Sequence, residues 1–232
     1  GGHSFGNLFI TTLHRITGDF REAVRLAGEV LNIVGRVLPS TTDKVALVAK
    51  HEDGSVTTGQ SEIQRTESRI EKVELKPSPS SVDEEIVNAI ESADLLVFGP
   101  GSLYTSIIPN LLVPGMAAAI RRSRAVKVYV CNVLTQVGET DGFDAADHVK
   151  AIERNAGARC FDVVLVNDRL VEIPSYRGGQ EFVSCDSAEL ERLGYEVEKK
   201  ELVSEGLLHD TCKVAQALID IYNAKLSEET AI

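Results

Sequence analysis

The chain alternates short apolar runs with segments of helical periodicity, and this alternation constrains the fold more than any other feature. The apolar runs are about five residues long and lack polar alternation, which is typical of strands covered on both faces. Strands that alternate with helices build a parallel sheet between two layers of helices. The sequence therefore predicts an α/β fold, a three-layer α/β/α, Rossmann-like arrangement with a mainly parallel sheet. The predicted strands are 94–98, 126–131 and 162–166, and the predicted helices are 82–91, 116–122 and 145–155.

The N-terminal part departs from this alternation and predicts two helices followed by a β-rich insertion. Residues 7–16 and 19–33 carry apolar side chains at helical spacing, and Gly18-Asp19 supplies a break and an N-cap between them. The β-rich insertion covers about 36–75, where Asp53-Gly54 marks a hairpin turn between extended runs. The extended runs are 36–38, 45–49 and 70–75.

The C-terminal part predicts a small αβ element and a terminal helix. The αβ element consists of extended residues 182–184, a helix over 188–193 and a strand over 197–203. The terminal helix is predicted at about 210–222 from its apolar spacing. We therefore expect a single domain over 1–226, with a frayed tail at 227–232.

Composition excludes several classes of function. The 35 acidic residues outnumber the 24 basic ones and give a net charge of −11, so no basic face is expected for nucleic acid or anionic lipid. No apolar run approaches the ~20 residues that span a bilayer. The 4 Cys residues form no Cys-x-x-Cys pair, which fits a reducing cytoplasm. We expect neither nucleic acid as a partner nor membrane insertion.

Two loops that follow predicted strands carry the first candidate ligand residues, because ligands bind at the carboxyl ends of parallel strands. The first loop places Gly99 and Gly101 around a proline, followed by Ser102 and two more hydroxyl residues. Small residues let backbone N–H groups approach a phosphate, and the hydroxyls add donors. A tight turn that only ends a strand is the alternative, since the loop has no P-loop lysine and no third glycine.

The second loop is polar and uncharged up to Glu139. Asn132, Thr135 and Gln136 are able to hydrogen-bond a base or a sugar, or to bond only within the loop. Asn7 lies at the entry of the first helix, where it either caps the helix or borders a site.

The sequence contains no recognisable catalytic set. No Ser/His/Asp or Cys/His combination emerges and no cluster has metal-ligand spacing, so we predict no catalytic residue and no metal ligand. His14, His51 and His148 lie beside acidic or exposed segments, and we predict that they are solvated.

Taken together, these motifs resemble the YvcK/CofD family (UPF0052). The block Gly-Pro-Gly-Ser-Leu-Tyr-Thr-Ser-Ile-Ile-Pro-Asn-Leu is highly specific, and the loop after the second strand is similar to the YvcK branch rather than to the transferase branch. The matching stretches are 2–8, 16–20, 35–41, 99–112, 129–140 and His209-Asp210.

Within the YvcK branch, the resemblance implies a UDP-sugar-binding regulator that links gluconeogenic carbon metabolism to cell-wall synthesis and cell shape. Its ligand is expected to be UDP-N-acetylglucosamine. The resemblance also implies phosphorylation at Thr211, and Leu208 stands where the branch often carries an arginine. The expected roles are Gly99, Gly101 and Ser102 at the diphosphate, Asn132, Thr135 and Gln136 at the nucleoside or sugar, Asn7 at the edge of the site and Tyr176 stacked on the uracil or sugar.

The CofD side of the family implies a different activity, a 2-phospho-L-lactate transferase of deazaflavin coenzyme synthesis. That reading expects a GDP- or GTP-linked donor and Mg²⁺, whereas the regulator requires no cofactor. A nicotinamide oxidoreductase and a pure interaction scaffold are further alternatives. We expect wall-synthesis proteins as indirect partners and a homo-oligomer. Family members begin with a glycine-rich strand-turn-helix that would precede Gly1, so the resemblance implies that this part is missing.

Overall fold

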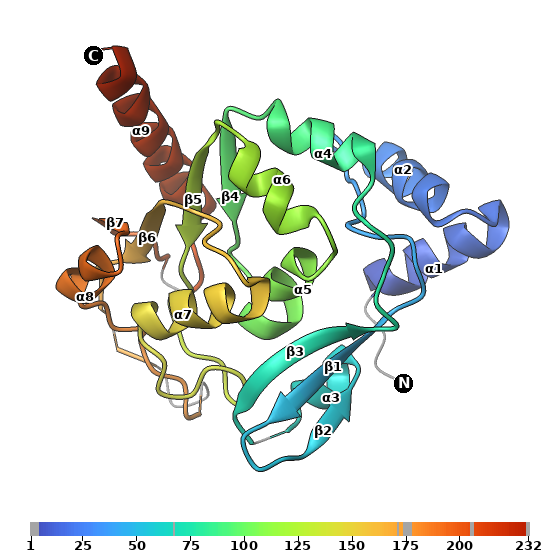
Figure 1. Ribbon diagram of the computed structural model, residues 1–232, viewed down its shortest axis with the longest axis horizontal. Helices are drawn as coiled ribbons and strands as arrows, with labels where there is room; N and C mark the ends of the chain where they lie inside the picture. Colours follow the sequence, from blue (N-terminus) through green and yellow to red (C-terminus); the bar gives the residue numbers. More distant parts are fainter. Residues whose placement is uncertain (1–4, 67, 171, 174–177, 205–206, 231–232) are drawn as a thin grey trace.

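A four-stranded parallel sheet forms the centre of the computed structural model (Figure 1). The structure describes residues 5–66, 68–170, 172–173, 178–204 and 207–230. The strands follow one another in chain order with parallel pairing, which confirms the predicted α/β class. The strands are β4 (Leu95–Phe98), β5 (Val126–Val130), β6 (Val163–Asn167) and β7 (Glu196–Lys200).

Helices cover both faces of this sheet because its central strands are apolar on both sides. Alternate residues of β5 and β6, such as Val128 and Leu165, pack with Ala217 and Ile221 of α9. Residues of the opposite pleat, such as Tyr129, lie in the larger core with α6 and α7. The covering helices are α4 (Glu84–Glu91), α5 (Ile108–Leu111), α6 (Met116–Arg122), α7 (Ala145–Ala156), α8 (Ser187–Arg192) and α9 (Thr211–Thr230).

A second, antiparallel sheet forms a lobe beside the parallel one, at the bottom of Figure 1. It consists of β1 (Ala46–His51), β2 (Val56–Thr58) and β3 (Ile70–Lys76), with the short α3 (Gln60–Ile63) between β2 and β3. The hairpin predicted at Asp53-Gly54 is confirmed, since β1 pairs with β2 in antiparallel register. We call residues 46–76 the β-lobe.

The two predicted N-terminal helices are present as α1 (Phe5–Thr17) and α2 (Phe20–Val30). The predicted N-cap holds, because the Asp19 carboxylate accepts the N–H of Glu22 at 3.0 Å. The strand predicted at 36–38 is wrong. Arg36 instead bonds Glu85 at 3.1 Å and Leu38 packs against the core, and the segment is part of neither described sheet.

The C-terminal segment differs in length from the prediction. Residues 182–184 form a single bridge between Phe182 and Leu134 rather than a strand. Helix α9 continues through Thr230, so residues 227–230 are helical where fraying is predicted. A bond from the Ser227 hydroxyl to the Asn223 carbonyl, at 2.9 Å, supports this last part of the helix.

Within the described ranges, no single helix has the length and apolarity to cross a membrane. The bent pair 103–111 and 116–122 passes that test only when its two segments are combined across a 74° bend. Most of their apolar side chains belong to the core.

The predicted solvation of two histidines is wrong. His51 is 1% exposed, and its ring nitrogens bond the Ser68 carbonyl and the Thr57 hydroxyl, both at 2.8 Å. His148 is fully buried in α7, where it donates to the Asp144 carbonyl at 2.8 Å. Tertiary packing buries both rings, and acidic neighbours in the sequence do not report it.

Candidate functional site

Loops at the carboxyl ends of β4 and β5 line an open cavity of about 340 Å³ together with the segment that precedes α9. This is the edge of the sheet at which parallel α/β proteins bind ligands. Among the residues predicted for a ligand, Gly101, Ser102, Asn132 and Gln136 line it. The other lining residues are Pro100, Val133, Leu134, Gln180, Leu207, Leu208 and His209.

The loop after β4 is shaped by its glycines. Gly99 adopts a φ of +86°, and a Cβ there would stand 3.2 Å from the Val130 carbonyl oxygen, so a side chain would strain the turn. Ser102 ends the loop, and its carbonyl accepts the N–H groups of Ser106 and Ile107 at 2.9 and 3.0 Å. The second of these bonds spans five residues and opens η1 (Leu103–Ile107), one π-helical turn.

Two backbone donors at this turn have no acceptor. The N–H groups of Gly101 and Ser102 make no hydrogen bond to any described residue. Both residues are half-buried and line the cavity. Unsatisfied backbone donors beside a cavity are the groups with which neutral loops bind phosphate oxygens.

Side chains from the two loops meet inside the cavity. The Gln136 amide donates to the Ser102 hydroxyl oxygen at 2.9 Å, and the Asn132 amide donates to the Gln136 side-chain oxygen at 3.4 Å. Because the Ser102 oxygen accepts from Gln136, its own hydrogen stays available as a donor. The structure therefore brings together three of the side chains that the sequence singled out.

Thr135 has a different position from its neighbours. It is 1% exposed, and its hydroxyl accepts the N–H of Glu181 at 2.9 Å. The Gln180 side chain donates to the Thr135 carbonyl at 2.9 Å. Thr135 thus holds the segment that carries Gln180 to the cavity, while its own hydroxyl lies outside the lining.

His209 lines the cavity and was not among the residues predicted to bind. Its Nε2 lies 3.2 Å from the Cys131 carbonyl oxygen, and a carbonyl only accepts, so we assign the proton to Nε2. Burial lowers the pKa of His209, although the bond to Cys131 opposes this shift. The ring is therefore neutral at pH 7, with Nδ1 as an acceptor. The His209-Asp210 pair among the matched stretches was the only available signal.

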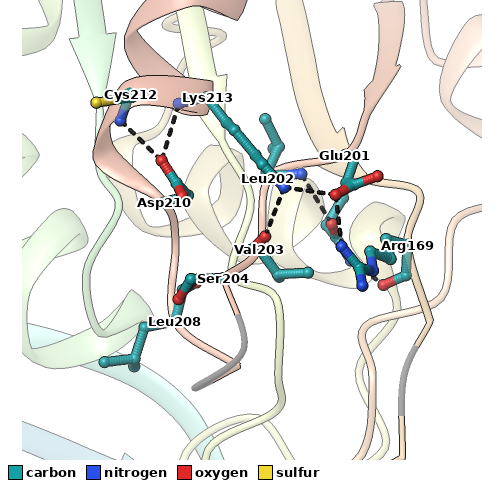
Figure 2. A network of polar contacts seen from close by, with 10 residues as sticks. Arg169, Glu201, Leu202, Val203, Ser204, Leu208, Asp210, Cys212 and Lys213 are labelled. Atoms are coloured by element: carbon teal, nitrogen blue, oxygen red, sulfur yellow. Dashed lines mark hydrogen bonds and ion pairs between the residues drawn. The ribbon is translucent and has the colours of Figure 1, made fainter.

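A polar network, drawn in Figure 2, fixes Asp210 and the start of α9, directly after His209 in the sequence. The Asp210 carboxylate accepts the N–H groups of Cys212 and Lys213 at 3.0 and 3.1 Å and so caps α9. The Lys213 ammonium donates to the Val203 carbonyl at 3.0 Å and also pairs with Glu201. These bonds hold the 201–204 and 208–213 segments against each other.

The cavity is electrically neutral over its described lining. No Lys, Arg, Asp or Glu lines it in that part of the chain. Leu208 stands at the position where the resemblance leads one to expect an arginine. It lies at the rim of the cavity and is 63% exposed. Magnesium binds through carboxylate oxygens and substrate phosphates, so these residues alone do not fit a magnesium ion. In the described chain, no group of three or more His, Cys, Asp or Glu is arranged to hold a metal.

Gly99 lines an adjacent pocket rather than this cavity. Three more predicted residues are not in the described lining. Asn7 belongs to α1, which does not line the cavity, and its side chain is outside the described atoms. Tyr176 lies outside the described residues. Thr211 is exposed as the first residue of α9, two positions after His209.

A larger cavity of about 550 Å³ lies between α2, residues 32–39 and α4. It contains three arginines, but each already has an acidic partner. Arg25 bonds Glu22 at 2.6 Å, for example, and Arg36 bonds Glu85 at 3.1 Å. The loop cavity is the better candidate, because it lies at the carboxyl edge of the parallel strands and the larger cavity does not.

The fold and this cavity define a Rossmann-like α/β protein with a polar pocket at the carboxyl ends of its parallel strands. The sequence profile of the family described as 2-phospho-L-lactate transferase CofD matches residues 1–203. A protein named gluconeogenesis factor from Bacillus subtilis is 43% identical over 231 residues, which are 95% of this chain and 72% of the relative. Another gluconeogenesis factor, from Halalkalibacterium halodurans, is 40% identical over 226 residues, which are 94% of this chain and 70% of the relative.

Structural similarity agrees with these sequence matches. The crystal structure of a UPF0052 protein from Bacillus halodurans has a TM-score of 0.87 and 40% identity, covering 94% of this chain and 73% of its own. The chain therefore belongs to the CofD family (UPF0052), on the branch whose members are named gluconeogenesis factors. The resemblance drawn from the motifs is confirmed.

Proposed function

We propose that this protein binds a nucleotide sugar of the UDP-N-acetylglucosamine kind in the loop cavity. The unsatisfied N–H groups of Gly101 and Ser102, next to the Ser102 hydroxyl, are the observation that carries the proposal. They and the turn at Gly99 receive the diphosphate. Asn132 and Gln136 bind the nucleoside or sugar, with a limited number of polar groups fixing its orientation.

The remaining predicted residues act around this core of the site. Thr135 contributes by holding Gln180 at the cavity. Asn7 borders the site and Tyr176 stacks on the uracil or sugar. Thr211 is the residue at which phosphorylation regulates the protein.

The proposed role is that of a cytoplasmic regulator that links gluconeogenic carbon metabolism to cell-wall synthesis and cell shape. The name gluconeogenesis factor, carried by relatives about 40% identical, supports the metabolic half of this role. In this role, the fraction of protein with ligand bound would follow the concentration of the wall precursor. Wall-synthesis proteins would respond indirectly to that fraction. The protein requires no cofactor for binding and acts as a homo-oligomer.

The description of the matched family favours one second candidate, a transferase that uses a GDP- or GTP-linked donor with Mg²⁺. The two candidates differ in ligand chemistry. A regulator of the first kind binds a UDP-sugar without a metal, whereas the transferase needs Mg²⁺ to bind its guanosine nucleotide tightly.

Isothermal titration of the full chain tests the proposal. UDP-N-acetylglucosamine, GDP and NAD are compared with and without Mg²⁺. Binding of the UDP-sugar alone supports the regulator, tight Mg²⁺-dependent binding of GDP supports the transferase, and binding of NAD alone would contradict both.

Alanine variants locate the site. Ser102→Ala and Asn132→Ala are expected to weaken UDP-sugar binding by roughly tenfold, the value of one lost hydrogen bond to a charged or polar ligand group. Ser106→Ala is the matched control, because this exposed hydroxyl is on the same segment but outside the cavity. All three variants should melt close to the parent, and loss of folding by both site variants would refute the site assignment.

A further inference from the structure

A buried carboxyl group joins the two loops of the proposed site. Glu139 is 3% exposed. Its Oε2 accepts the Tyr104 N–H at 3.3 Å and its Oε1 accepts the Thr105 hydroxyl at 3.0 Å. Both donors belong to η1, which begins directly after Ser102. Glu139 therefore bonds the element that sets the direction of the Ser102 backbone.

The turn that carries Glu139 is itself closely bonded. The Thr140 N–H donates to the Gln136 carbonyl, and the Gln136 N–H donates to the Thr140 hydroxyl oxygen, both at 2.8 Å. The Gly138 N–H donates to the Asp141 carboxylate at 2.6 Å. These bonds close the turn and direct the Glu139 side chain inward, toward η1.

The β-lobe contacts the same turn from the other side. The Gln64 amide donates to the Thr105 hydroxyl oxygen at 3.4 Å. A Cβ on Gly138 would stand 2.6 Å from the Thr66 carbonyl oxygen, so the two backbones are in direct contact. Thr105 is thus bonded both by Glu139 and by the β-lobe.

Packing alone does not account for a carboxyl group at this position. Burial raises the pKa of Glu139, against the lowering effect of its hydrogen bonds, and no described cation forms an ion pair with it. An apolar side chain would fill the same space without the desolvation cost. What only an oxygen acceptor provides is a fixed position for the Tyr104 N–H and the Thr105 hydroxyl.

We propose that Glu139 is a positioning residue of the nucleotide-sugar site. By bonding η1, it fixes the Ser102 turn against the Gln136 loop and seats both loops on the β-lobe. The inference rests on the proposed function, because the affected property is affinity for the ligand. Glu139 itself lies outside the cavity lining and acts through η1 and Ser102.

The test compares three variants of the full chain for affinity and thermal stability. Glu139→Ala removes the acceptor, and Glu139→Gln keeps one oxygen for the Tyr104 N–H. Asn155→Ala is the matched control, because the buried Asn155 accepts the Val73 N–H at 2.9 Å and so secures the β-lobe through α7 and β3, without a bond to either loop. Affinity for UDP-N-acetylglucosamine is measured by titration at a temperature where every variant is folded.

We expect Glu139→Ala to lose roughly tenfold or more in affinity, with Glu139→Gln restoring most of it. Asn155→Ala should lose stability but stay within about twofold of the parent affinity. Affinity that is unchanged in Glu139→Ala, or reduced equally in Asn155→Ala, overturns the proposal.

Hydrogen exchange separates this proposal from the proposed function. Amide exchange over 101–106 is compared between the parent and Glu139→Ala without ligand. If the parent does not bind the UDP-sugar, the proposed function fails. The exchange rates then still decide whether Glu139 positions the loop. Faster exchange confined to 101–106 supports positioning of this loop, and unchanged exchange overturns it.

Discussion

Replacement of Gly138 by alanine tests the contact between the ligand loop and the β-lobe. Gly138 has a φ of +83°, and its added Cβ would approach the Thr66 carbonyl oxygen to 2.6 Å. Gly142 in the same loop provides a matched control. Its φ is +70°, but its nearest neighbour would be a side-chain nitrogen of Arg69 at 3.6 Å, which is an ordinary contact.

The two substitutions share one cost and differ in the other. A left-handed conformation costs an alanine about 1–2 kcal/mol at either position. The overlap with Thr66 adds about 1–3 kcal/mol for Gly138→Ala alone, because a backbone carbonyl in a packed contact moves less readily than an arginine tip. Gly138→Ala should therefore lose about 2 kcal/mol more free energy of unfolding than Gly142→Ala.

Thermal and urea denaturation of the two variants measure this difference. For a domain of this size, about 2 kcal/mol corresponds to a midpoint about 4–8 °C lower for Gly138→Ala than for Gly142→Ala. The urea m-value should be the same for both, since the surface exposed on unfolding does not change. Equal midpoints would show that the loop and the β-lobe do not touch at this point.

Three further outcomes follow from the charge of single side chains. Leu208→Arg should tighten UDP-N-acetylglucosamine binding by about fivefold in titration, because a cation at the rim gains about 1 kcal/mol with a diphosphate, and unchanged affinity would place the diphosphate elsewhere. Burial lowers the pKa of His148, so the stability it contributes is present above its unfolded pKa of about 6.5 and declines as pH falls, by up to about 1.4 kcal/mol per unit. Urea unfolding from pH 7.5 to 5 should show a weaker pH dependence in His148→Gln, and equal slopes would contradict this. Thr211→Glu should retain the parent melting temperature, because a negative charge is favourable in the first turn of α9. Its UDP-sugar affinity should fall severalfold through repulsion, and an undiminished affinity would separate Thr211 from the site.

The parallel sheet was predictable because its signals are local. The apolar runs at 94–98 and 162–166 indicate by their composition that both faces are covered, and the structure shifts their ends by at most one residue. The error at 36–38 has the opposite cause. Three residues of suitable composition become a strand only beside a strand edge, and that depends on tertiary structure.

The site was predictable to the extent that sheet topology determines it. Ser102 and Gln136 follow adjacent parallel strands, so their loops meet at one edge, and the structure bonds the two side chains. Gln180 reaches the cavity through the Leu134–Phe182 bridge, and the Glu139 contact joins residues 34 positions apart in sequence. No local pattern predicts either contact, because both depend on how the loops fold over the sheet.

Charge places a final constraint on how this cavity binds an anion. The chain carries a net charge of −11, and no cation lines the described cavity, so a diphosphate approaches against repulsion. The binding free energy must then come from short hydrogen bonds to neutral donors, and salt screens only the repulsion. Between about 0.05 and 0.3 M salt, affinity in titration should hold or rise by up to about twofold, whereas that of Leu208→Arg should fall. A parent affinity that drops steeply with salt would contradict neutral recognition, because such a drop requires a cation at the ligand.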